Sequence, residues 1–280
     1  MVTVAQAGAR TQDGSALLDS SGGPVPKPGM AEAPREFRAI TARAPLPPMP
    51  IDDYLAELDQ LIDRHHYFRQ DKVVPAIGAG TASREVVQRV ALEFYYLGRW
   101  MTPELPVLIA NAPDSYAFVM EESVHYHHWA QNFADESGYL GDPNHVQMKV
   151  DFCRQLGLTD DDIRSYQPLP ETIAMTCTML YYVRRSYEEG LAVFGYAGER
   201  VAAGSGYAKT LYEGLGKHYG VGVKNFGVHA YAEPDHGQKA EDLFRLVAET
   251  RTIQDRCRTA IRNYLMVAEA RVQSMNRWVE

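Results

Sequence analysis

The stretch His229-Ala-Tyr-Ala-Glu233-Pro-Asp-His236 combines the residue types and the spacing of a metal site. On a helix, positions 229, 233 and 236 follow an i, i+4, i+7 pattern and share one face. Two imidazoles with a carboxylate between them suit a pair of metal ions on the order of 4 Å apart. Pro234 removes a backbone hydrogen bond, so a kink is expected there and Asp235 is an alternative ligand to Glu233. The competing interpretation is a solvated polar face.

A metal pair held by one helix would be exposed, so further carboxylates are expected from facing helices. Glu199 follows the apolar run Leu-Ala-Val-Phe-Gly-Tyr-Ala-Gly, and Glu136 precedes His145 across a predicted helix break. Glu93 stands among bulky apolar neighbours, where an unpaired charge is costly, so it either binds something or turns outward. The ordinary alternatives for Glu199 and Glu136 are a surface residue and a helix end.

A second Glu-x-x-His pair, Glu122-Ser-Val-His125, competes with this assignment. Together with Glu93, Glu199 and the pair at 233 and 236, it gives the ligand order of a ferritin-like di-iron bundle. The three close histidines at 125, 127 and 128 equally fit a polar helix face or a substrate pocket, which is the simpler interpretation.

The elements that would position these residues are all helical, because apolar residues recur at helical spacing from position 51 onward and no strand pattern occurs. Short loops favour antiparallel neighbours in a bundle. Pro103 and Pro106 are expected to end or kink the second helix. The predicted helices are Ile51 to His66, Ser83 to Asn111, Ser115 to Ser137, Pro143 to Leu156, Glu171 to Ala197, Gly204 to Tyr219, Asn225 to Glu249 and Thr252 to Trp278.

Composition narrows the class of protein further. Residues 1–48 are rich in Ala, Gly, Ser and Pro and are predicted to be a disordered tail before one domain at 49–280. The net charge of -8 with no basic stripe argues against nucleic acid. Three cysteines without CxxC spacing, no long apolar run and no signal-peptide pattern predict a cytoplasmic protein with no membrane segment.

These motifs, in their order along the chain, resemble the haem-oxygenase-like di-iron oxidases, which are related to pyrroloquinoline quinone synthase and thiaminase II. The resemblance covers residues 55 to 275 and includes Asn132-Phe-Ala-Asp-Glu136-Ser-Gly, Leu156-Gly-Leu-Thr-Asp-Asp-Asp and Leu169-Pro-Glu-Thr. It implies an all-α bundle of about seven to eight helices holding two ferrous ions, with O2 as co-substrate. The iron ligands that it implies are Glu136, His145, Glu199, His229, Glu233 and His236, with Glu93 as a further carboxylate. Family members often carry Asp where Glu233 stands. A fainter similarity to ferritin-like arylamine N-oxygenases would use Glu122 and His125 instead.

The function implied by the resemblance is an iron- and O2-dependent oxidoreductase acting on a small amino acid or amine in natural-product biosynthesis. Arg99, Arg184 and Arg185 could clamp a carboxylate, although scattered arginines more often have structural roles. Two alternatives remain: a metal-free enzyme of the quinone synthase or thiaminase kind, and a non-catalytic binding protein on the same bundle. The fold also permits a homodimer.

Overall fold

A computed structural model gives the structure of the chain and describes residues 46–113, 124–138 and 144–280. Within helices it describes only the backbone at positions 203, 204, 225 and 228–237. The predicted tail and Glu122 therefore lie outside the described residues. Residues 46–280 form one compact unit, which is the part of the chain considered below.

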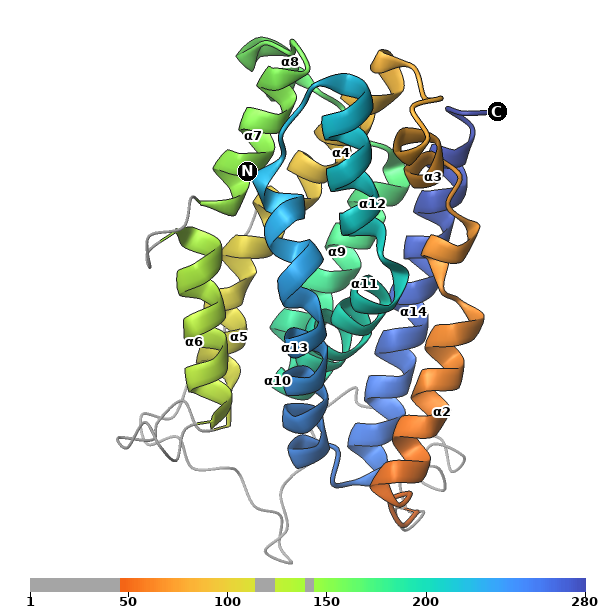
Figure 1. Cartoon of the computed structure of the whole chain (residues 1–280). Coiled ribbons are helices and arrows are strands. Elements are labelled where there is room, and N and C mark those ends of the chain that lie inside the picture. The colour runs from red at the N-terminus through yellow and green to blue at the C-terminus, as the bar shows by residue number, and fades with distance from the viewer. Residues whose placement is uncertain (1–45, 114–123, 139–143) are drawn as a thin grey trace, which may run out of the picture. The chain divides into compact units, whose positions relative to one another are not determined.

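In the first half of this unit, neighbouring helices pack antiparallel to one another, as α5 does beside α6 (Figure 1). Pro103 and Pro106 interrupt the expected second helix at a 3-10 turn, which confirms the prediction made for them. The elements are α2 (Ile51–Arg64), η1 (Tyr67–Gln70), α3 (Val73–Gly78), α4 (Arg84–Met101), η2 (Thr102–Glu104), α5 (Leu105–Asn111), α6 (Val124–Ser137), α7 (His145–Gln155) and α8 (Asp160–Ser165).

The second half supplies the long helices of the bundle. α13 runs past Pro234 without a break, and α14 packs along α9 and α2 (Figure 1). None of the helices in the described ranges is both long enough and apolar enough to cross a bilayer. The elements are α9 (Pro170–Arg185), α10 (Tyr187–Gly190), the π-helical η4 (Leu191–Gly198), α11 (Glu199–Ser205), α12 (Tyr207–Gly214), the π-helical η5 (Leu215–Tyr219), α13 (Lys224–Val247) and α14 (Arg251–Asn276).

Two of the expected helices are broken where a single residue leaves helical geometry. At Ser186 the backbone is extended, with φ −161° and ψ 159°, and the hydroxyl accepts a hydrogen bond from Glu189 N, which caps a new helix. At Gly206 φ is +65°, a left-handed conformation that glycine adopts without steric cost. The helices predicted over 171–197 and 204–219 were therefore wrong in their continuity, although the helical class was right.

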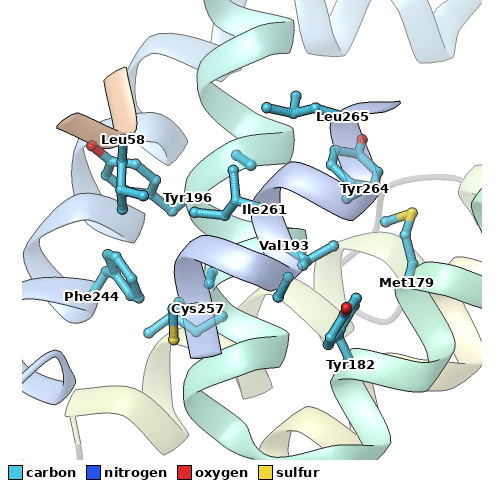
Figure 2. Packing of buried hydrophobic residues seen from close by; sticks show 14 of the residues in the cluster. Leu58, Met179, Tyr182, Val193, Tyr196, Phe244, Cys257, Ile261, Tyr264 and Leu265 are labelled. Carbon is cyan, nitrogen blue, oxygen red and sulfur yellow. The ribbon is translucent and has the colours of Figure 1, made fainter. Parts of the chain in front are cut away.

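The buried side chains form two apolar clusters. The first, part of which Figure 2 shows, joins α2, α9, η4, α13 and α14 through residues such as Leu58, Tyr196, Phe244 and Ile261. The second joins α3, α4, α7 and α12 through residues such as Phe152. Met179 and Tyr264, both labelled in Figure 2, belong to the first cluster and also line the cavity described next.

Candidate metal centre and substrate cavity

A cavity of about 170 Å³ lies between the two apolar clusters, and members of both contribute to its wall. The apolar part of the wall consists mainly of phenylalanine, leucine and methionine side chains from η1, α4, α5, α9, η4 and α13. Polar groups interrupt it, namely the side chains of Thr102, Asn132, Glu136, Lys149, Glu199 and Arg271 and the tyrosines Tyr67, Tyr207 and Tyr264. A mainly apolar cavity with a small number of convergent polar groups is the usual form of a small-molecule site.

Glu136, near the end of α6, lines this cavity and contacts His145, the first residue of α7. Asn144 fixes that start, because its side chain accepts a hydrogen bond from Gln147 N and donates one to Ser137 O. His145 Nδ1 lies 2.7 Å from Glu136 Oε1, and His145 is only 5% exposed. The structure thus brings together two of the predicted ligands, while their binding of metal stays a prediction.

Glu199 is the first residue of α11 and lines the same cavity. The π-helical segment η4 directly precedes it, and η4 is anchored by fully buried residues such as Leu191 and Tyr196. Wide π turns inside helices often accompany functional sites. Burial raises the pKa of Tyr264, and the negative charge of Glu199 raises it further. The hydrogen bond with Tyr67 and the positive charge of Arg271 oppose this rise. Glu199 therefore stands close enough to act on this part of the cavity.

The predicted ligands at 229, 233 and 236 lie on α13, but their side chains and that of Asp235 are outside the described residues. Their positions on the helix can still be compared with Phe226, which lines the cavity. Positions 229, 233 and 236 follow Phe226 by three, seven and ten residues, and all fall within a quarter turn of it at 100° per residue. The helical register of α13 is therefore compatible with the predicted ligand set.

Glu93 and His125 have partners elsewhere. Glu93 is fully buried and is not among the residues that line the cavity; its Oε1 accepts hydrogen bonds from Tyr166 Oη at 2.5 Å and Leu169 N at 2.9 Å. His125 is buried, and its Nδ1 lies 2.7 Å from Tyr187 Oη. These contacts favour structural roles for both residues, and their metal binding stays a prediction.

Two cationic residues at the cavity, Lys149 and Arg271, were not predicted from the sequence. Lys149 lies one helical turn after His145, and burial lowers its pKa, while the charge of Glu136 opposes this shift. Arg271 lies on the buried stripe of α14, seven residues after Tyr264, and is 5% exposed. A charged residue on the apolar stripe of an amphipathic helix is the signal that could have revealed Arg271.

The arginines considered from sequence as carboxylate clamps are engaged elsewhere. Arg184 pairs with Glu104, Arg185 pairs with Glu189, and Arg99 lies over the ring of Tyr96. None of these arginines is among the residues that line the cavity.

Comparison with known proteins supplies the family. A model of a family of iron-containing redox enzymes matches residues 117–269, which is more than half of the chain. The chain belongs to this family. The matched segment includes Glu136, His145, Glu199 and all of α13, whereas Glu93 precedes it. No curated protein matches the sequence.

Solved structures confirm the haem-oxygenase-like fold for this member of the iron-containing redox enzyme family. A haem-oxygenase-like domain of unknown function from Shewanella denitrificans superposes with a TM-score of 0.60 at 14% identity, covering 82% of this chain and 93% of its own. A TenA homologue from Pseudomonas syringae gives 0.65 at 11% identity, covering 84% and 99%. A CADD-like protein of unknown function from Nostoc punctiforme gives 0.60 at 15%, covering 81% and 97%. These likenesses show the fold alone.

The donor set around the cavity fits iron. Carboxylate oxygens of Glu136 and Glu199 and an imidazole nitrogen of His145 are donor types that iron accepts. Among the residues whose side chains are described, no three His, Cys, Asp or Glu side chains converge as a complete metal site. The remaining predicted donors, His229, Glu233 and His236, with Asp235 as the alternative, stand on α13, where their side chains lie outside the described residues.

Proposed function

We propose that this chain is an iron-dependent oxidoreductase that consumes O2 and oxidises a small amino-acid or amine substrate inside the cavity. The observation that carries the proposal is the contact between the buried His145 and Glu136, which lines an apolar cavity together with Glu199. Two ferrous ions, when bound, supply the electrons that reduce O2. The residues proposed to hold them are Glu136, His145, Glu199, His229, Glu233 and His236.

The chain itself orients the substrate and excludes water. The wall of the cavity is mainly apolar, so water is weakly held there and polar groups of a substrate are directed to the few polar side chains. Lys149 is a candidate proton carrier, because it lines the cavity together with Glu136 and burial lowers the pKa of its ammonium. Its position one turn from His145 puts this group on the side of the cavity where Glu136 lies.

The experiment is an anaerobic titration of metal-depleted protein with ferrous iron, followed by measurement of O2 uptake with amino acids and amines. We expect about two irons per chain and O2 uptake that depends on iron. His229→Ala and His236→Ala are expected to bind less iron with unchanged helix content. His127→Ala, which removes an exposed imidazole on α6, serves as the control and is expected to bind as much iron as the wild type.

Each result separates this proposal from its rivals. Full iron binding in both α13 variants would remove these histidines from the site. No iron binding by the wild type would favour a metal-free enzyme on the same fold. Iron binding without O2 uptake on any amine or amino acid would favour a binding protein.

A further inference from the structure

Arg271 is a buried cation at the wall of the cavity. Its Nε donates a hydrogen bond to Thr172 Oγ1 at 2.9 Å, and Thr172 itself is fully buried. Its Nη2 is also buried and has no hydrogen-bond partner among the described residues. A buried guanidinium with an unused donor is costly unless a partner arrives from outside the protein.

The surroundings of Arg271 do not supply a counter-charge in contact. In the described part of the chain no carboxylate forms an ion pair with Arg271. The buried carboxylate of Glu189, by contrast, is paired with two arginines, Arg185 and Arg256. The ring of Phe94, with its centroid 5.8 Å from the guanidinium carbon, offsets only about 0.5 to 2 kcal/mol of the burial cost.

Two more distant acids act on the same region. The positive charge of Arg271 interacts electrostatically with Asp71. However, Asp71 Oδ1 already accepts hydrogen bonds from the backbone amides of residues 73 and 74. The charges of Glu199 and Arg271 both shift the pKa of Tyr264, in opposite directions. In the proposed function the carboxylate of Glu199 binds iron, which neutralises its charge. The guanidinium therefore remains available to an anion that enters the cavity.

We propose that Arg271 binds the carboxylate of the substrate, so that the substrate is a small carboxylic acid with an apolar body, such as an apolar amino acid. This inference rests on the proposed function and names its substrate class. A guanidinium offers donors in a planar fork that matches a carboxylate. The apolar wall and the volume of about 170 Å³ favour a short aliphatic or single-ring body.

The same geometry orients the substrate. Arg271 faces Phe94, while the side chain of Lys149 packs against Gly98, one turn further along α4. Four residues of helix correspond to a rise of about 6 Å. A substrate held at Arg271 by its carboxylate can therefore extend its body toward the end of the cavity where Lys149 and Glu136 lie.

The test measures binding by calorimetry, in metal-free protein and in anaerobic ferrous protein, with hexanoate, hexanamide and L-leucine as probes. We expect hexanoate or L-leucine to bind roughly 10- to 100-fold more tightly than hexanamide, as a charge-assisted contact predicts. Arg271→Gln should lose this preference and bind hexanamide as the wild type does. Arg262→Gln, which changes an exposed arginine on the same helix, should keep the preference.

Stability provides a readout that a purely structural arginine would not give. Because Arg271→Gln removes an uncompensated buried charge, the metal-free variant should be at least as stable to urea as the wild type. Each of three results would overturn the proposal. The first is a variant that is less stable to urea than the wild type, the second is equal binding of hexanoate and hexanamide by the wild type, and the third is no binding of either carboxylate by the wild type. The metal-free arm stands without iron, so a failure of iron binding in the titration above is distinguishable from a failure here.

Discussion

The buried contacts of Glu93 predict a structural residue whose loss costs stability and leaves iron binding intact. Its Oε1 accepts hydrogen bonds from Tyr166 and Leu169, which tie the segment between α8 and α9 to α4. Hydrogen bonds to a charged group contribute about 1.5 to 3 kcal/mol each. Its Oε2 is buried without a partner among the described residues, so desolvation opposes part of this gain. We therefore expect Glu93→Ala to lower the free energy of unfolding by about 3 kcal/mol.

A double-mutant cycle in urea isolates the contact with Tyr166. We expect Tyr166→Phe alone to cost about 1.5 to 3 kcal/mol and the coupling with Glu93→Ala to be of similar size. Tyr219→Phe is the matched control, because Tyr219 Oη donates to the backbone oxygen of Ala82 instead, and it should show no coupling with Glu93→Ala. The ferrous titration of Glu93→Ala should give the wild-type number of irons. A coupling near zero, or a loss of iron in Glu93→Ala, would refute the reasoning.

Three further outcomes follow from the described contacts. A Cβ at Gly214 would lie 2.6 Å from Gly78 Cα, so Gly214→Ala should lower the free energy of unfolding in urea by about 1 to 3 kcal/mol. A Cβ at Gly216 would meet no atom within 4 Å, so Gly216→Ala should raise this free energy by about 0.5 to 1 kcal/mol. Equal effects of the two substitutions would contradict the close approach of α12 and α3. Burial and the hydrogen bond to Glu93 raise the pKa of Tyr166 above 10.0. Above pH 10 the folded state therefore keeps a proton that the unfolded chain loses, and the free energy of unfolding should fall as the pH rises. In Tyr166→Phe this fall should be less steep. Ferrous iron at about 100 times its dissociation constant should stabilise the wild type by about 2.7 kcal/mol and His229→Ala by much less, measured as anaerobic urea midpoints before and after chelation.

The sequence predicted the helical class because apolar periodicity persists through most of the domain, and it predicted the break at Pro103 and Pro106 because proline lacks an amide donor. The break at Ser186 was missed, since a serine is tolerated inside helices and becomes a cap only when the surrounding packing turns the chain. The segment around Gly206 was missed for a similar reason, because glycine permits a left-handed turn without requiring it.

The candidate site was predictable where chemistry and spacing coincide. Glu136 and His145 were expected from neighbouring helix ends, and the structure places them in contact. Arg271 and Lys149 were not anticipated, because their place at the cavity depends on how α14 packs against α9 and η1 and how α7 packs against α4, and local spacing does not contain that information. The sequence therefore indicated acids and imidazoles, whereas the cations that would select a substrate became visible only in the folded chain.

The π-helical segment η4 makes the length of the chain before Glu199 matter more than its composition. A π-helix places five residues in each hydrogen-bonded repeat instead of four, so each of its residues turns the chain by less than the about 100° of an α-helical residue. If the eight residues of η4 were wound as an α-helix instead, Glu199 and Ala202 would both be rotated away from their present directions at the cavity wall. The number of residues in η4 and its wide winding together therefore set the direction in which the acid after it faces.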